Sequence, residues 1–272
     1  MLQLNAQILK YVAQKIDEVV GIQYTEDNYY QLESRLQDLC KSLKIESTDT
    51  LWKLIYHDQD AKIMDQIYDL STNNETSFFR DPTMYAAFKD IILEGRPFGN
   101  RTAQLWCAAS STGQEPYSVA MMCETAPGFS YEIHATDFSN RVLERCRHGV
   151  YSNLEVQRGL RGEFKRDFFE AHDLDSNQWK IKDSIRNKVS FEFLNLIDRW
   201  PPDHGPFDVV FCRNVLIYQT VEMKKKIIEQ ICDILNDPGY LILGGTESIV
   251  GLSNRFDSLS HHGGGVIYQK KG

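Results

Sequence analysis

The chain has 272 residues, of which 42% are hydrophobic and 25% are charged. This length and composition suit one large folded domain or two smaller ones and argue against a disordered or fibrous chain. The formal net charge is −8 at pH 7, which argues against nucleic acid or an anionic membrane surface as the main partner. The acidic excess is concentrated at the front, because residues 1–70 carry seven basic and twelve acidic side chains.

The cysteines and the N-terminus indicate a cytoplasmic protein. The six cysteines are scattered without a CxxC or CxxH pair, which is typical of buried free thiols in a reducing compartment rather than of a zinc site. No apolar stretch approaches the roughly 20 residues that span a bilayer. Lys10, Lys15 and Asp17 interrupt the N-terminal segment where a signal peptide would have an apolar core. We therefore expect no insertion into a membrane.

The first part of the chain has only helical periodicity. Apolar residues recur at helical spacing up to about residue 70, which predicts a small helical domain. A further helix is expected over 82–94, with Asp81 as N-cap and Pro82 at the first helical position. The stretch 94–100 contains two glycines and a proline and reads as a linker. We predict a helical N-terminal domain at 1–94 and a second domain at 95–272.

From residue 103 onward, short apolar strands alternate with amphipathic helices. This alternation predicts an α/β domain with a largely parallel sheet covered on both faces. Ser139 is expected to cap the helix that follows the second strand, and Gly149 to end it. The region 150–188 does not follow the alternation and is predicted to be a small inserted subdomain. The predicted strands are 103–109, 131–137, 189–195, 207–213, 240–244 and 266–270, and the predicted helices are 115–125, 139–148 and 221–235.

The loops after the strands contain the candidate site residues, because ligands of open parallel sheets bind at the carboxyl ends of the strands. The turn at 108–118 consists of small residues and leads through Glu115 into a helix. It has neither the GxGxxG fingerprint nor a P-loop, so taken alone it is equally compatible with an ordinary turn. Asp137 ends the second strand, where folds of this kind hold ribose hydroxyls. Because Ser139 can serve as N-cap, a ligand role for Asp137 is favoured over a capping role.

Polar residues also follow the third and fourth strands. Asn195 and Leu196 come after the third strand, and Arg213 and Asn214 after the fourth. Polar groups that emerge from apolar strands suit a pocket, although asparagine at 214 also suits a turn. Upstream, the segment 73–82 reads NNETSFFRDP. Its two phenylalanines suit the core, whereas the polar residues have no such structural explanation; these are Asn74, Thr76 and Arg80.

Six motifs in order resemble one family. The segments NNETSFFRD, WCAASSTGQEPYS, ATDFSNRVLE, VQRGL, FDVVFCRNVLIY and GYLILGGTES are similar in sequence and spacing to the CheR family. Members of this family are S-adenosylmethionine-dependent methyltransferases that esterify glutamate side chains of chemotaxis receptors. The resemblance covers nearly the whole chain. It implies a class I, Rossmann-like methyltransferase sheet with a small inserted subdomain, preceded by an all-α N-terminal domain.

The resemblance also implies the cofactor, its contacts and the partner. The cofactor would be S-adenosylmethionine, with S-adenosylhomocysteine as product, and the partner would be the cytoplasmic helices of methyl-accepting receptors. A monomer is expected, without nucleic acid. The family's cofactor contacts fall on Asn74, Thr76, Arg80, Glu115, Asp137, Asn195, Leu196, Arg213 and Asn214.

Two features depart from the best-studied members of that family. Their second N-terminal helix has a basic face, whereas here residues 26–44 mix acidic and basic side chains. Members that dock on a C-terminal receptor pentapeptide have a glycine-containing loop in the inserted subdomain. The corresponding segment at 172–188 contains no glycine. We therefore predict methylation that is independent of a pentapeptide tether.

The acceptor side of the site is less well defined by the sequence. A glutamate acceptor with an ordinary pKa of about 4.3 is ionised at neutral pH, so no general base is expected. Arg96 is the candidate that would orient the carboxylate, although a solvated linker residue is an equally good interpretation. Tyr218 could line the acceptor side, although a packed aromatic fits as well. His261 and His262 are adjacent and precede three glycines, which favours a hairpin turn over a metal site.

Two alternatives to the receptor methyltransferase remain open. A methyltransferase of the same fold could act on another acceptor, such as a small carboxylic acid. A non-catalytic signalling module could bind S-adenosylmethionine or S-adenosylhomocysteine without transferring a methyl group.

Overall fold

The computed structural model describes residues 4–173 and 177–272, and their chain falls into two compact units. The helical unit extends to Asn73 and includes Tyr218–Met223, and the sheet unit contains Asn74–Ile217 and Lys224–Gly272. The sequence places the domain boundary near residue 95 instead. The structure differs because the segment after Asn73 belongs to the core of the sheet unit, where Phe78 and Phe88 are both 0% exposed.

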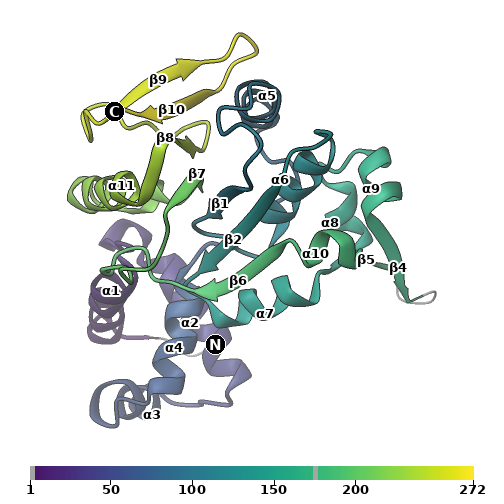
Figure 1. Ribbon diagram of the computed structural model, residues 1–272. Coiled ribbons are helices and arrows are strands. Elements are labelled where there is room, and N and C mark those ends of the chain that lie inside the picture. The colour runs from purple at the N-terminus through teal and green to yellow at the C-terminus, as the bar shows by residue number, and fades with distance from the viewer. Residues whose placement is uncertain (1–3, 174–176) are drawn as a thin grey trace. The chain divides into compact units, whose positions relative to one another are not determined.

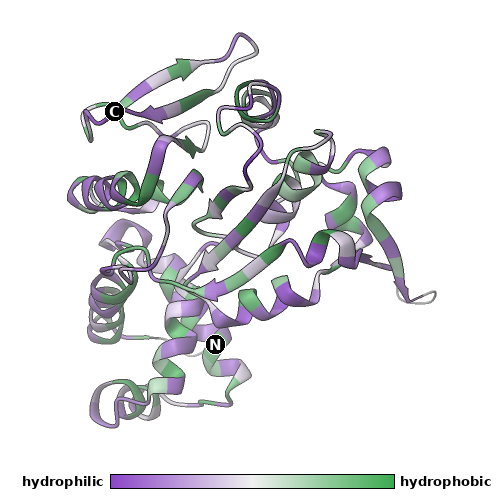
Figure 2. Cartoon of the chain, viewed as in Figure 1, coloured by the Kyte–Doolittle hydropathy of each residue, from purple (hydrophilic) through white to green (hydrophobic). Residues whose placement is uncertain are grey.

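The helical unit is built from amphipathic segments, and Figure 2 shows hydrophobic and hydrophilic residues alternating along them. Asn5 caps the first helix by accepting a hydrogen bond from the Ile8 amide, and Gly21 ends it with a φ of 74°. No helix among the described residues is both long and apolar enough to cross a membrane. The elements are α1 (Ala6–Val20), η1 (Glu26–Asn28), α2 (Tyr29–Ser42), α3 (Thr48–Trp52), η2 (Lys53–His57) and α4 (Ala61–Ser71).

The sheet unit contains a seven-stranded sheet in the order β6-β2-β1-β7-β8-β10-β9 (Figure 1). The five strands from β6 to β8 are parallel, and β10 pairs antiparallel with both β8 and β9. The predicted parallel sheet is therefore present, with an antiparallel edge. Its strands are β1 (Ala103–Cys107), β2 (Tyr131–Asp137), β6 (Val189–Phe193), β7 (Phe207–Cys212), β8 (Leu235–Leu243), β9 (Phe256–Ser260) and β10 (Val266–Lys270).

The remaining strands form a small antiparallel sheet in the order β3-β5-β4 within the region 150–188. Its strands are β3 (Val150–Ser152), β4 (Phe169–Asp173) and β5 (Gln178–Ile181). The glycine-free segment that predicts tether independence falls partly on 174–176, outside the described residues. The helices of this region are α8 (Asn153–Gln157), α9 (Gly162–Phe168) and α10 (Asp183–Arg186).

The other helices precede the large sheet or follow its strands in the chain. Ser139 caps α7 by accepting from the Val142 amide, and Gly149 ends it in the left-handed conformation, as predicted. Asp81, in contrast, is not a side-chain cap: it has a φ of 58° and makes no capping hydrogen bond. These helices are α5 (Pro82–Phe88), η3 (Lys89–Glu94), α6 (Gln114–Glu124), α7 (Asn140–His148), η4 (Leu216–Tyr218) and α11 (Val221–Ile234).

Candidate functional site

The order of the strands defines where a ligand binds. From β1 the chain first adds β2 and β6 on one side and then returns to place β7 on the other side of β1. In open parallel sheets the binding crevice lies outside the carboxyl ends of the strands at this reversal. The loops that begin after Cys107, Asp137 and Cys212 therefore form the candidate site, together with the loop after β6.

The loop after β1 requires a glycine where it meets α6. Gly113 has a φ of 93°, and a Cβ there would lie 2.7 Å from Tyr151 Oη and 3.1 Å from Cys146 Sγ. Both the backbone conformation and the close packing thus exclude a side chain. The Ser110 amide donates to Thr136 O over 2.8 Å, which fixes the loop to the end of β2.

Asp137 connects the loops that follow three strands. Its Oδ2 accepts from the Ser111 amide over 2.8 Å, and its Oδ1 accepts from the Ser139 amide over 3.0 Å. Its backbone carbonyl accepts from Leu194 N over 3.1 Å, immediately before Asn195. A carboxylate accepts hydrogen bonds at about four sites, which suits it to hydroxyl donors. The structure thus holds this buried carboxylate in a fixed orientation at the reversal point.

Arg213 is the centre of a buried ionic cluster. Its side chain is 2% exposed, and its Nη1 donates to Glu115 Oε2 over 2.8 Å. Its Nη2 donates to Arg80 O over 2.5 Å and to Asp81 Oδ2 over 3.1 Å. The carboxylate of Asp81 therefore serves this ion pair rather than the helix end. The cluster ties the loop after β7 to α6 and to the segment before α5.

Burial and charge act against each other in this cluster. Burial raises the pKa of Glu115, and the Arg213 guanidinium beside it opposes the rise. Burial lowers the pKa of Arg213, but Glu115, Tyr85 and Asp81 more than offset this, so that its pKa is raised. The arginine therefore stays charged beside the carboxyl group of Glu115.

The segment 74–80 is held against the same loops. Ser111 Oγ donates to Asn74 O over 2.9 Å, and the Phe79 amide donates to Ser118 Oγ over 3.0 Å. Arg80 is exposed and donates through Nη1 to Glu75 O over 3.1 Å. Thr76, which lies between Asn74 and Arg80 in the chain, is half-buried. The sequence-predicted residues of this segment are thus close in the fold to the loop after β1.

The loop after β7 is organised by a residue that the sequence analysis missed. Glu247 Oε2 accepts from the amides of Asn214 over 2.6 Å and Gly244 over 2.8 Å. Its Oε1 accepts from the amides of Val215 over 3.0 Å and Ile217 over 3.3 Å. One carboxylate thus binds four backbone donors. In the sequence, Glu247 belongs to the GGTES segment. This motif contributes to the family resemblance, but it does not indicate what its glutamate binds.

Asn214 is also constrained from the side of the neighbouring strand. Its φ is 58°, so it occupies the left-handed region, as the sequence suggests for a turn. A Cβ at Gly244 would lie 2.6 Å from Asn214 Nδ2 and 2.8 Å from Glu247 Oε2. These short distances leave no room for a side chain at position 244.

Asn195 follows β6 and is buried. Its Oδ1 accepts a hydrogen bond from the Ile197 amide over 3.3 Å, and the neighbouring Leu196 is also buried.

The two predicted acceptor-side residues make their hydrogen bonds with groups outside this cluster. Arg96 donates to Pro127 O over 2.5 Å and to Gly128 O over 3.1 Å, just before β2 begins. It therefore lies at the amino end of that strand. Tyr218 belongs to the helical unit, where its hydroxyl accepts from Asn73 Nδ2 over 3.0 Å. Their roles toward the substrate stay predictions.

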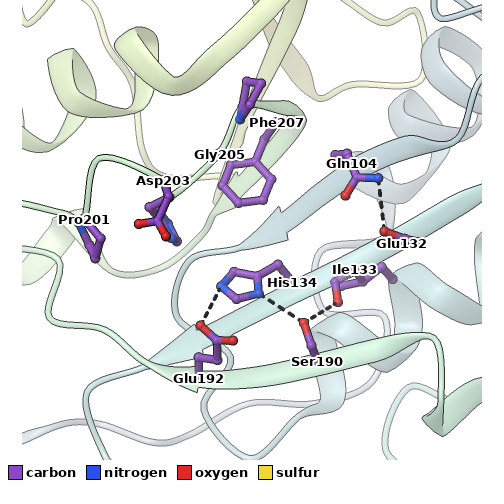
Figure 3. Close-up of a pocket in the computed structure, with 12 residues that line it drawn as sticks. Gln104, Glu132, Ile133, His134, Ser190, Glu192, Pro201, Asp203, Gly205 and Phe207 are labelled. Atoms are coloured by element: carbon purple, nitrogen blue, oxygen red, sulfur yellow. Dashed lines mark hydrogen bonds and ion pairs between the residues drawn. The ribbon is translucent and has the colours of Figure 1, made fainter.

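A separate cavity of about 440 Å³ lies over the amino-terminal parts of the strands (Figure 3). Gln104, Glu132 and Phe207 line it, and each is the first or second residue of its strand. Burial lowers the pKa of His204 in its wall to about 4. None of the predicted cofactor residues is among the described residues that line it, so this cavity is distinct from the site at the carboxyl ends.

The adjacent histidines occupy the turn between β9 and β10, as predicted. The His261 amide donates to Gly265 O over 3.1 Å, which closes the turn. The structure adds a carboxylate that the local motif lacks, because His261 Nε2 lies 2.7 Å from Asp90 Oδ2. This hydrogen bond lowers the pKa of Asp90 and connects the hairpin with η3. That no metal binds here stays a prediction.

Comparison with known proteins identifies the family. The family model described as CheR methyltransferase, SAM binding domain, matches residues 74–263. The chain belongs to the CheR methyltransferase family. A chemotaxis protein methyltransferase from Vibrio parahaemolyticus is 39% identical over 262 residues, which cover 94% of each protein. The chemotaxis protein methyltransferase of Escherichia coli is 29% identical, with 94% of this chain and 89% of that protein covered.

The motifs predict a class I methyltransferase sheet that follows a helical region in the chain, and this fold is confirmed. It rests on the strand order and on the family match. Among solved structures, the magnesium protoporphyrin IX methyltransferase from Synechocystis with bound S-adenosylmethionine has a TM-score of 0.40 and 13% identity, with 69% of this chain and 76% of that chain covered.

S-adenosylmethionine is the cofactor of this CheR domain, and the residues at the site suit it. Asp137 offers carboxylate oxygens for a ribose diol. Ser110 Oγ and Arg213 Nε are buried and have no hydrogen-bond partner among the described residues, which is expected of groups that face a polar ligand. The protein is therefore an S-adenosylmethionine-dependent methyltransferase by family.

Proposed function

We propose that this CheR protein methylates glutamate side chains of chemotaxis receptors, with S-adenosylmethionine as donor and S-adenosylhomocysteine as product. The observation that carries the proposal is the convergence of Asp137, Arg213 and Glu247 on the loops at the reversal point of a CheR domain. The names of the relatives support it, since proteins called chemotaxis protein methyltransferase match over 94% of the chain.

When bound, the cofactor supplies an electrophilic methyl group on a sulfonium sulfur. The acceptor carboxylate, with an ordinary pKa of about 4.3, is already ionised at neutral pH and needs no base. The thiol of Cys146, beside the loop after β1, is unsuited to act as a nucleophile, because burial raises the pKa of Cys146 to about 12. The residues of this chain therefore act by binding, orientation and exclusion of water, an effect worth about 7–11 kcal/mol in favourable cases.

We assign distinct tasks to the residues of the site. Asp137 holds the ribose, with its orientation fixed by the Ser111 and Ser139 amides. Glu115 offers a carboxylate to the ammonium group of the methionine part, and Arg213 keeps that carboxylate in place. The other proposed cofactor contacts are Asn74, Thr76, Arg80, Asn195, Leu196 and Asn214.

On the acceptor side we retain Tyr218 and Arg96 as candidates. Tyr218 is 38% exposed and follows Asn214 by four residues in the chain. The hydrogen bonds of Arg96 to the carbonyls before β2 give this arginine a structural task as well. A variant that raises the KM for the acceptor without a change in cofactor affinity would identify either residue as an acceptor contact.

The experiment that tests the proposal is transfer of labelled methyl from S-adenosylmethionine to a receptor cytoplasmic fragment. The expected product is a base-labile ester, because a glutamate methyl ester is hydrolysed by mild alkali. Label on a small carboxylic acid alone would indicate another acceptor. Cofactor binding without transfer to any carboxylate would indicate a signalling module instead.

The proposal includes two properties of the complex with the receptor. We expect the enzyme to act as a monomer on the cytoplasmic helices of the receptor. We also expect it to act without a pentapeptide tether, for which the glycine-free segment at 172–188 is the support. A receptor fragment that lacks its C-terminal residues should then be methylated as fast as the full fragment.

A further inference from the structure

A cavity of about 570 Å³ lies where the small antiparallel sheet meets the end of α7. The last turn of α7 and the helix α10 border it on two sides, and β3, β4 and β5 supply the rest of its wall. The cavity shares no lining residue with the proposed cofactor contacts. The described residues that line it are Arg145, His148, Val150, His172, Lys180 and Arg186.

The lining of this cavity is basic in a protein whose net charge is −8. It has two arginines, one lysine and two histidines, and no carboxylate is among its described lining residues. Arg145 pairs with Glu155 through Nη2, and Arg186 pairs with Asp183 over 2.8 Å. A guanidinium has five N–H donors, so both retain donors for a ligand. The ammonium group of Lys180 forms no ion pair within the described part of the chain.

The helical unit carries an acidic excess. Residues 1–70 have a net charge of −5. The one arginine of α2, Arg35, donates through Nη1 to Tyr24 Oη over 2.9 Å, to Leu70 O over 2.7 Å and to Ser71 O over 2.8 Å. Its guanidinium is thus committed to its own unit. The net charge of this unit therefore does not favour an acidic partner.

We propose that this basic cavity binds carboxylate side chains in an acidic segment of the protein acceptor. The inference rests on the proposed function, because a segment that presents several unmodified glutamates carries several negative charges. Each methyl ester removes one of these charges. The cavity therefore favours the less methylated acceptor, and binding weakens as methylation proceeds.

The test uses the full-length protein and two versions of one receptor cytoplasmic fragment. One version has glutamates in its methylated region, and the other has glutamines at all but one of these positions. Lys180→Glu reverses one charge of the cavity wall, and His172→Glu is a second variant on a different strand. Lys225→Glu on α11 is the matched control, since Lys225 is exposed and lies outside the cavity.

The expected result is a KM for the glutamate fragment that is raised about two- to fivefold in Lys180→Glu and His172→Glu, as for loss of a surface charge pair. The rise should shrink at high salt and with the glutamine fragment, while S-adenosylmethionine affinity stays unchanged. Equal KM values in Lys180→Glu, His172→Glu and Lys225→Glu would overturn the assignment. Binding of inorganic phosphate in the cavity, together with a KM for the fragment that these variants leave unchanged, would also overturn the assignment. Absence of methyl transfer by the unaltered protein would refute the proposed function instead.

Discussion

Replacement of Glu247 by alanine should damage both the stability of the sheet unit and its affinity for the cofactor. This carboxylate accepts hydrogen bonds from four backbone amides, two of them shorter than the others, from Asn214 and Gly244. Alanine leaves all four donors without their partner. The left-handed Asn214 would then lose the contact that holds the loop after β7 in place.

The size of the effect follows from the number of donors that lose their acceptor. A buried donor left unsatisfied costs about 1–3 kcal/mol. The amides of Asn214, Val215 and Gly244 are partly buried, whereas that of Ile217 is exposed and can bond to water. We therefore count three donors, each near the lower end of this range because none is fully buried, and expect a loss of about 3–5 kcal/mol, or roughly 6–20 °C in melting temperature. If the free energy of cofactor binding is reduced by about 1.4 kcal/mol, the affinity for the cofactor falls about tenfold.

Thermal unfolding and S-adenosylmethionine titration by calorimetry measure the two effects separately. Glu170→Ala is the matched control, because Glu170 is an exposed glutamate on β4, outside the site. Glu247→Gln should be intermediate, since its amide oxygen can replace one carboxylate oxygen but its NH₂ group faces backbone donors. A melting temperature and an affinity in Glu247→Ala equal to those of the control would refute the positioning role.

Three further predictions concern the cofactor, the tether and pH. Asp137→Ala should abolish S-adenosylmethionine binding in calorimetry while circular dichroism shows an intact fold, and unchanged affinity would refute the ribose assignment. A C-terminal receptor pentapeptide should give no heat of binding, and detectable binding would contradict tether independence. Burial lowers the pKa of His204 from its ordinary 6.5 to about 4, so only the unfolded chain takes up a proton between these values. The free energy of unfolding should therefore fall as the pH drops from about 6.5 to about 4, and it should fall less in His204→Gln. Urea titrations at several pH values measure this. Equal pH profiles of the two proteins would show that His204 is not responsible.

The regular parts of the sheet unit follow from local pattern. The strands predicted at 131–137 and 266–270 have the same bounds in the structure, because apolar runs flanked by polar turns define them. The strand β9 was missed because its sequence, FDSLS, is largely polar and exposed. It is a strand only through antiparallel pairing with β10, which no local pattern reveals.

The site could be predicted where a residue type has one evident task. Asp137, Arg213 and Asn214 could be proposed as site residues because polar groups rarely follow buried strands without a reason, and their cofactor roles stay predictions. Glu247 was missed because three of its four partners are backbone amides about 30 residues earlier in the chain, which have no sequence signature. The N-cap expected at Asp81 was wrong because a buried arginine from a distant loop takes its carboxylate instead.

The most direct test of the central claim is methyl transfer to a receptor cytoplasmic fragment with glutamates in its methylated region. The protein with labelled S-adenosylmethionine should give base-labile label on glutamates of the fragment, and Asp137→Ala should give none. Label that resists alkali, or no label on the fragment although the cofactor binds, would contradict the proposed glutamate methyltransferase.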